Sequence, residues 1–410
     1  MEKYNNYKDS DIDWLLDEIP SHWETKRIKD LCKMQSGFYI SANDFKDEGF
    51  PIYGGNGFRG FSEDYNHDGE YTLVGRQGAL CGNINYVKGK FWATEHAIVV
   101  YEKKGVNKFW FGELLRLMNL NQYSLSAAQP GLSVEKIKRL KLPFIPSLKE
   151  QTQIANYLDA KTSAIDKKVT LLQKKIKHYK AYRKTLINET VTKGLDNDTS
   201  NWISFRLKDI GYLYSGLSGK SGNDFNQDKN PNNRGFIPFT NIANNTYLNK
   251  NHLGTVVIEE NENQNQVKKN DIFFLMSSEG YEDIGKSAVL IADIKETYLN
   301  SFCKGFRITN NKCEASFINY LLLSDSYRQE MLVEGKGFTR INLKMEKVNN
   351  FSIVIPPTKK EQQQIAIYLD TKTSTIDKIV KNIKTQIATL KELRKTLINE
   401  VVTGKVKVTT

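Results

Sequence analysis

The sequence contains few of the residues that build disulfide frameworks and metal sites. Only four of its 410 residues are cysteines, and they form no CxxC pair. We interpret Cys32, Cys81, Cys303 and Cys313 as buried thiols of a protein in a reducing compartment. The five histidines are scattered without metal-ligand spacing, so we expect no metal site.

Long apolar runs are also missing. Hydrophobic residues make up 39% of the chain, and no stretch of them is long enough to span a bilayer. No signal-peptide pattern is present either, so we expect a soluble, cytoplasmic protein. Acidic residues are fewer than basic ones, and the net charge of +12 favours a polyanionic partner such as nucleic acid. A solvated, lysine-rich surface is the competing interpretation of this charge.

Signatures of catalysis are scarce. Residues 280–287 match the phosphate-loop pattern G-x4-G-K-S and follow an expected strand at 271–276. That pattern requires a following helix, whose N-terminal amides bind phosphate, whereas residues 288–291 predict a strand. We therefore favour a glycine-rich hairpin, with an NTPase as the alternative. No methyltransferase signature of the form (D/N)PP(Y/F) occurs, and no nuclease-like cluster stands out.

What the chain does contain is an internal repeat. Residues 146–192 and 357–403 align at a constant offset of 211 without a gap, and more than half of the positions are identical. A proline precedes each copy, which predicts that each helix begins cleanly. The repeat extends upstream, because the pattern that starts at Trp23 recurs at Trp202. The repeating unit is therefore about half of the chain.

Each repeated segment carries an apolar seam at heptad spacing. The expected seam residues are Leu158, Ile165, Leu172, Ile176 and Leu186 in the first copy, and Leu369, Ile376, Ile383, Ile387, Leu390 and Leu397 in the second. The 4-3 spacing over about five heptads predicts a coiled coil, and we expect the two helices to pair antiparallel. Arg183 and Arg394 interrupt the seam at matched places and can set its register.

The rest of the chain forms two blocks of mixed character. Strands are expected at 50–53, 70–74, 83–87, 97–101, 237–239, 271–276, 288–291 and 305–308, and helices near 107–120 and at 314–332. We predict an α+β fold in which two globular domains are joined by two long helices that form an antiparallel coiled coil, with a pseudo-two-fold internal repeat. The expected boundaries are an arm at 1–23, a first domain at 24–145, a first helix at 146–195, a second domain at 196–355 and a second helix at 356–410.

The ordered motifs resemble the specificity subunit of type I restriction–modification systems. They are the opening from Asp9 to Trp23, the segments Pro146–Asp159 and Pro357–Asp370, the segments Thr162–Asp166 and Thr373–Asp377, and the repeated Arg-Lys-Thr-Leu-Ile at 183–187 and 394–398. The resemblance covers essentially the whole chain. It implies two target-recognition domains, each of which reads one half of a bipartite site in double-stranded DNA.

The resemblance also implies partners. The helical spacer is expected to hold two methyltransferase subunits, and two restriction subunits can join that core. S-adenosylmethionine and ATP would then belong to the partner subunits, and this chain would hold no cofactor and perform no catalysis. A coiled-coil scaffold that does not read sequence is the other class of function left open.

The glycine-rich turns of both blocks carry side chains suited to reading bases, because arginine pairs with guanine, and asparagine or glutamine with adenine. The candidates are Asn56, Arg59, Arg76, Gln77, Asn83, His96 and Gln129 in the first block, and Arg234, Asn241, Ser277, Ser278, Tyr281, Lys286, Arg340 and Asn342 in the second. Ordinary turn residues are the competing interpretation. Lys174, Lys175, Lys177 and Lys180 are candidates for contacts with the phosphate backbone, with a solvated helix face as the alternative.

Overall fold

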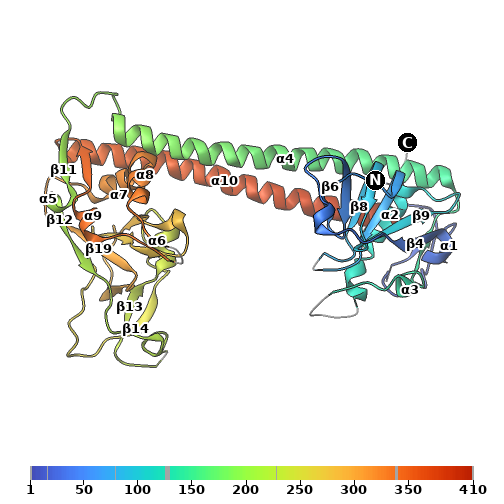
Figure 1. The fold of residues 1–410 in the computed structure, drawn as a ribbon, viewed down its shortest axis with the longest axis horizontal. Coiled ribbons are helices and arrows are strands. Elements are labelled where there is room, and N and C mark those ends of the chain that lie inside the picture. The colour runs from blue at the N-terminus through green and yellow to red at the C-terminus, as the bar shows by residue number, and fades with distance from the viewer. Residues whose placement is uncertain are drawn as a thin grey trace. The chain divides into compact units, whose positions relative to one another are not determined.

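The structure is a computed structural model that describes residues 2–408, apart from residues 16, 79, 125–129, 228 and 338–339. The chain divides into two compact units (Figure 1). The first comprises Met1–Gln173 and Lys384–Thr410, and the second comprises Lys174–Ile383. Each unit therefore contains one globular part and a portion of each long helix, α4 (Leu148–Lys193) and α10 (Lys359–Val402).

The first unit is built on a six-stranded sheet with the order β4-β9-β7-β8-β5-β6. These strands are β4 (Cys32–Ser36), β5 (Phe50–Gly54), β6 (Gly57–Ser62), β7 (His67–Gly75), β8 (Ile84–Ala93) and β9 (Ala97–Glu102). Neighbouring strands are antiparallel except for the parallel pair of β5 and β8. The four strands expected in this block are confirmed, and β7 and β8 are longer than predicted.

Helix α2 (Lys108–Leu117) joins this sheet to the long helices. The side chain of Asn107 caps its start by accepting hydrogen bonds from the amides of Phe109 and Trp110, both at 3.1 Å. One cluster of buried side chains contains Trp110 of α2, Leu158 of α4 and Val401 of α10. The helix pair and the globular part of this unit therefore share a single hydrophobic core.

The second unit contains a four-stranded and a three-stranded sheet. The four-stranded sheet has the order β12-β19-β15-β17, with β12 (Gly211–Ser215), β19 (Cys303–Ile308), β15 (Ile272–Leu275) and β17 (Ser287–Val289). The three-stranded sheet has the order β14-β13-β18, with β14 (Gly254–Val257), β13 (Asn233–Ile237) and β18 (Thr297–Leu299). A single buried cluster again joins a sheet to both long helices, through residues such as Phe317, Val191 and Leu369. The second unit thus repeats the packing scheme of the first.

Two expectations for the second block are wrong in detail. The single helix expected at 314–332 is broken into α7 (Ala315–Leu323) and α8 (Asp325–Val333). Ser324 between them is extended, and its hydroxyl donates to the carbonyl of Leu321 at 2.7 Å, which competes with helix continuation. The strand expected at 237–239 ends at Ile237, because Pro238 has no amide for the ladder and α6 (Phe239–Asn244) follows it.

The hairpin expected in place of a phosphate loop is confirmed. Strands β15 and β17 pair antiparallel, and the segment between them holds the two-residue strand β16 (Ser277–Ser278) and a short 3-10 turn (Tyr281–Asp283). Ser287 begins a strand rather than a helix, so the amide-lined helix N-terminus of a phosphate loop is missing at this motif.

Small matched elements frame each globular part. They are β3 (Glu24–Arg27), α1 (Ile28–Leu31), α3 (Val134–Ile137) and β10 (Lys141–Phe144) in the first unit, and β11 (Ile203–Arg206), α5 (Leu207–Ile210), α9 (Met345–Asn349) and β21 (Ser352–Ile355) in the second. β3 pairs with β10, and β11 pairs with β21, both antiparallel. The remaining short strands are β1 (Tyr7–Lys8), β2 (Ile19–Pro20), β16 (Ser277–Ser278) and β20 (Ile341–Asn342).

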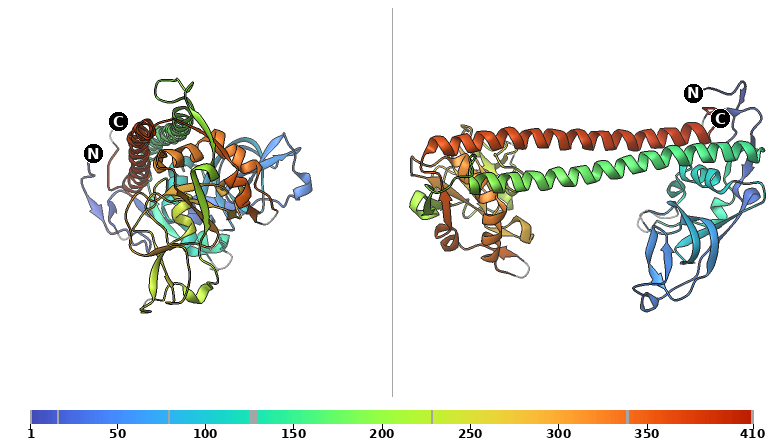
Figure 2. Two further views of the ribbon diagram at one scale, coloured as in Figure 1. Left: turned by 90° about the vertical axis from the view of Figure 1, so that its left-hand side faces the viewer. Right: turned by 90° about the horizontal axis from the view of Figure 1, so that it is seen from above.

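The antiparallel coiled coil is also confirmed. In the first unit the start of α4 lies against the end of α10, since Nε of Arg394 contacts Asp166 at 3.1 Å and 3.2 Å. In the second unit the start of α10 lies against the end of α4, since Nε of Arg183 lies 3.3 Å from Asp377. Figure 2 shows α4 and α10 lying side by side. All of the seam positions named above are buried or half-buried.

A buried glutamine ties each long helix to its globular part. Gln151 accepts a hydrogen bond from the amide of Asn107 (2.7 Å) and donates to the carbonyls of Gly105 (3.1 Å) and Ile145 (2.7 Å). Gln362 makes the same three contacts in the second unit, with Glu314, Lys312 and Pro356. Both side chains are at most 1% exposed, and the backbone groups that they satisfy are buried at Ile145 and Pro356 and partly buried at the other four positions.

Replacing this glutamine should destabilise its unit. We expect Gln151→Ala to lower the free energy of unfolding by about 2–4 kcal/mol, because it leaves one buried and two partly buried backbone groups without partners. Asn156→Ala, on an exposed position of the same helix, is the control and should change stability by less than about 0.5 kcal/mol. Urea unfolding followed by circular dichroism measures both, and equal effects would contradict the anchoring role.

Candidate DNA-contacting surfaces

Four of the predicted DNA-contacting residues of the first unit meet at one cavity. Asn56, Arg59, Gln77 and His96 line it together with Phe58 and three glycines. Asn56 and Arg59 lie on the turn and first residues of the β5–β6 hairpin, Gln77 follows β7, and His96 lies between β8 and β9. Side chains from three separate segments thus converge on a space of about 540 Å³.

Close backbone packing under the cavity depends on glycine. A Cβ atom added to Gly75 would lie 2.2 Å from the carbonyl oxygen of Gly55. One added to Gly55 would lie 2.9 Å from the carbonyl oxygen of His96. Any side chain at these two positions would push the three turns apart, so the glycines let the candidate residues approach one another.

Polar groups without hydrogen-bond partners and arginines without ion pairs, among the described residues, lie at or near the cavity. Nδ1 of His96 and Nδ2 of the nearby Asn85 are buried and have no hydrogen-bond partner in the part of the chain that the structure describes. Among the described residues, neither Arg59 nor Arg76 forms an ion pair. Buried polar groups without partners are rare, and those that occur often contact a ligand or water. This surface is suited to a polar, anionic ligand.

The turn that carries Gln77 is attached to the segment ahead of α3. The amide of Leu132 donates to the carbonyl of Arg76 at 2.9 Å, and Gln77 forms a bridge with Gly131. The candidate Gln129 lies just before this attachment, outside the described residues. Asn83 is half-buried in the β7–β8 turn, where its carbonyl accepts from the amide of Gly75.

The second unit makes the equivalent attachment with different side chains. Strand β16 pairs with β20, which places Ser277 opposite Asn342 and Ser278 opposite Ile341. Leu343 donates to the carbonyl of Met276 at 2.8 Å, as Leu132 does to that of Arg76. The same backbone frame therefore presents glutamine in one unit and serine in the other.

Acidic residues neutralise the candidate cations of the second unit. Arg234 pairs with Glu296 (2.9 Å), Lys286 with Asp283 (2.6 Å) and Arg340 with Glu279 (3.3 Å). Arg340 also lies over the ring of Phe302, and Tyr281 donates to the carbonyl of Leu332. The second unit therefore presents less net positive charge at its candidate residues than the first.

The prediction that Asn241 reads bases is wrong. Its side chain is fully buried, and its amide nitrogen donates to the carbonyls of Asn249 (3.0 Å) and His252 (2.7 Å). Its oxygen accepts from the amide of Asn249 at 3.0 Å, so the group has no capacity left for a base. Ser278 is only 7% exposed, and its hydroxyl accepts from the amide of Gly280. Both residues shape turns.

The four candidate lysines of α4 are exposed, as phosphate contacts require. Lys180 also lines a cavity of the second unit together with Lys286. Lys175 lies over the ring of Tyr179 at 5.9 Å.

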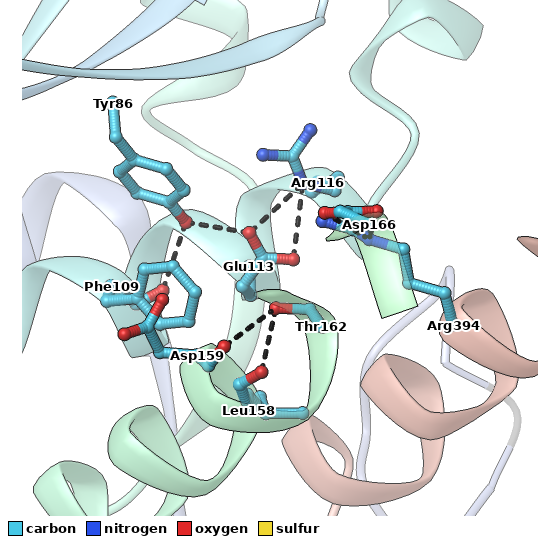
Figure 3. Close-up of polar contacts among 9 residues, drawn as sticks. All are labelled: Tyr86, Phe109, Glu113, Arg116, Leu158, Asp159, Thr162, Asp166 and Arg394. Carbon is cyan, nitrogen blue, oxygen red and sulfur yellow. Dashed lines mark hydrogen bonds and ion pairs between the residues drawn. The ribbon is translucent and has the colours of Figure 1, made fainter. Parts of the chain in front are cut away.

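A buried carboxylate that the sequence pattern did not reveal fixes the first unit near its helices (Figure 3). Glu113 is 1% exposed and accepts hydrogen bonds from Tyr86 (2.9 Å) and from Nε of Arg116 (3.1 Å and 3.2 Å). Burial, and then the charge of Glu113, raise the pKa of Tyr86 well above its usual value. The hydroxyl therefore stays protonated and ties β8 to α2. Glu113 lies within the apolar periodicity of α2, so spacing alone gave no signal.

The cysteine thiols have low reactivity. All four cysteines are free and buried, as expected. Burial raises the pKa of Cys32 and of Cys303 to about 12 and that of Cys313 to about 11, so none forms a reactive thiolate near neutral pH. In the described parts of the chain, no group of three or more metal-ligating residues is present, and no helix is long and apolar enough to cross a membrane.

We expect Asn241→Ala to lower the free energy of unfolding by about 2–4 kcal/mol, because it leaves several buried backbone groups unpaired. The exposed Asn342 provides the control, since Asn342→Ala should leave stability within about 0.5 kcal/mol. Chemical unfolding of both variants compares the effects. Normal stability of the Asn241 variant together with altered DNA preference would restore the original interpretation of this residue.

The chain was compared with known families and proteins. The family model for the type I restriction modification DNA specificity domain matches it twice, at residues 20–178 and 199–389. The specificity subunit of the type I restriction enzyme EcoprrI from Escherichia coli is 46% identical over 162 residues. A putative type I restriction enzyme specificity subunit from Haemophilus influenzae is 28% identical over 191 residues.

These two alignments cover 38% and 44% of this chain, and 40% and 47% of the relatives' own lengths. A solved structure from work on the structural basis underlying complex assembly and conformational transition of the type I R-M system has the same fold. Its TM-score is 0.73 at 14% identity, and the match covers 95% of this chain and all of that one.

Proposed function

Because this chain belongs to the family of type I restriction–modification DNA specificity domains, we propose that it reads the two halves of a bipartite target in double-stranded DNA. The first unit reads one half-site and the second unit reads the other. The observation that carries the proposal is one backbone frame, present twice, that presents different side chains at equivalent turns, such as Gln77 and Ser277. Two similar backbone frames that present different side chains are suited to reading two half-sites of different sequence.

Charge supports DNA as the partner. The chain carries 59 basic and 47 acidic residues. In the first unit Arg59 lies near Asn56, and Arg76 is next to Gln77 in the chain. Neither arginine forms an ion pair with a described residue, so these segments combine hydrogen-bonding groups for base edges with charge for phosphates. These residues are the strongest candidates for direct readout. Asn241 is excluded because it is buried.

The long helices are proposed to fix the separation of the half-sites and to hold two methyltransferase subunits. Tyr182 and Leu393 occupy equivalent positions of the repeat, and they are 55% and 53% exposed. Large apolar side chains exposed at matched positions suit two copies of one partner. Two restriction subunits join this assembly through the methyltransferase subunits.

Catalysis is assigned to the partners in this proposal. S-adenosylmethionine is bound by the methyltransferase subunits and ATP by the restriction subunits. This chain supplies sequence recognition and geometry. A scaffold that does not read sequence is the competing function, and it predicts salt-dependent DNA binding that is equal for all duplexes even with the partners present.

Exchanging the first domain should change one half of the target only. We expect replacement of residues 24–145 by those of another family member to alter one half-site and leave the other half-site and the gap unchanged. Co-expression with the methyltransferase partner, followed by genome-wide mapping of methylated positions, measures this. The matched control exchanges residues 196–355 and should alter the opposite half-site. New bases in both halves, or in neither, after the first exchange would refute the assignment.

Shortening the helices should shorten the gap. Deleting residues 172–178 and 383–389 together removes one heptad from each helix and preserves the 4-3 pattern. At about 1.5 Å per helical residue and about 3.4 Å per base pair, the gap should lose about three base pairs while both half-sites persist. Methylation mapping gives the answer, and an unchanged gap would show that the helices do not set the spacing.

A further inference from the structure

A basic cavity lies within the second unit, where the last turns of α4 meet the globular part. Lys180, Arg183, Lys184 and Lys286 are among its lining residues, and its volume is about 610 Å³. Asp377 is the one carboxylate among the described residues that line it. Two further carboxylates pair with lining cations, since Asp325 contacts Lys184 and Asp283 contacts Lys286. Lys180 is in no ion pair among the described residues.

Two polar groups in the wall have hydrogen-bonding capacity left. Ser287 lines the cavity and is 1% exposed, and its hydroxyl has no partner in the described part of the chain. Nε of Arg183 is buried and lies 3.3 Å from Asp377, but it forms no hydrogen bond there. The equivalent Arg394 makes two hydrogen bonds to Asp166. Buried donors without acceptors are costly, so a ligand that accepts hydrogen bonds would stabilise this wall.

We propose that this cavity binds one phosphate group. Lys180 supplies positive charge, and Nε of Arg183 and the hydroxyl of Ser287 each donate a hydrogen bond to a phosphate oxygen. Lys286 and Ser287 come from the G-x4-G-K-S sequence, but here they lie on the turn and start of a strand, so side chains replace the helix amides of a phosphate loop. The site therefore holds phosphate without the geometry for nucleotide hydrolysis. The inference is independent of which bases the chain reads.

Two sources can supply such a group, a phosphodiester of the DNA backbone and a free phosphate. The exposed lysines 174, 175 and 177 precede Lys180 on the same helix, which favours the DNA backbone as the source. A backbone phosphate there would add a sequence-independent contact in the second unit, where the candidate base readers are neutralised by acids.

The test uses the full chain in complex with its methyltransferase partner and compares three variants. Lys180→Ala removes a charge from the cavity, and Ser287→Ala removes the unpaired hydroxyl without changing charge. Lys360→Ala, at an exposed position of α10 that does not line the cavity, is the matched control for charge. Binding of a fixed duplex is measured from low to high salt, and thermal unfolding is measured with and without inorganic phosphate.

For a backbone phosphate, Lys180→Ala should reduce the slope of log K against log salt by about 0.9, and Lys360→Ala should leave it unchanged. Ser287→Ala should weaken duplex binding about ten-fold at a constant slope, because a hydrogen bond to a charged group is lost. For free phosphate, inorganic phosphate should raise the unfolding temperature of the unmodified complex but not that of the Lys180 or Ser287 variants.

The proposal is overturned if neither readout distinguishes Lys180→Ala from Lys360→Ala. Should Ser287→Ala fail to fold, the exposed Lys180 still decides the result, because its replacement leaves the core intact. Methylation mapping of the unmodified complex keeps the two hypotheses apart. Failure to read a bipartite target would appear there, whereas failure of the phosphate site would appear only in the variants.

Discussion

The antiparallel pairing of α4 and α10 is the constraint on which the rest of the structure depends. In each unit, the seam of the helix pair and the globular part contribute to one buried cluster. Without its partner helix, either globular part would expose an apolar face. The matched pairs Arg394–Asp166 and Arg183–Asp377 are partly exposed, so each contributes only about 0.2–1 kcal/mol. Burial of the seam therefore supplies most of the stability of the helix pair, and the prediction that the two arginines set its register stays a prediction.

In this arrangement, the residues that hold the backbone frame differ from the residues that form the candidate contact surface. Residues that hold the frame are repeated in both units, for example the buried Gln151 and Gln362 with identical sets of backbone partners. At the equivalent turns, by contrast, the residues differ, as Gln77 and Ser277 do. The first unit presents Arg59 at an open cavity without an ion pair among the described residues, whereas Arg234 and Arg340 of the second unit pair with Glu296 and Glu279. The two units therefore offer a common scaffold with distinct electrostatic surfaces.

The repeat, the helices and the fold class could be read from the sequence, because heptad spacing and a gapless 211-residue offset are local patterns with few structural solutions. Candidate contact residues were only partly predictable. Residue type and position in a turn predicted both Asn241 and Arg59 as base readers, yet Asn241 is fully buried and Arg59 is exposed. Whether a turn asparagine faces a ligand or its own backbone depends on chain segments far away in sequence, and no local pattern encodes them.

The sequence by itself thus determined two long heptad helices, a duplicated mixed fold and an excess of positive charge. Only the tertiary structure decided which side chains meet. It brought Asn56, Gln77 and His96 to one cavity, buried Glu113 where it accepts a hydrogen bond from Tyr86, and placed Ser287 and Lys180 in the lining of another cavity. The physical reason is the distance in sequence between the residues that interact. Helix periodicity is fixed by hydrogen bonds four residues apart, whereas a site is fixed by packing between segments separated by tens to hundreds of residues.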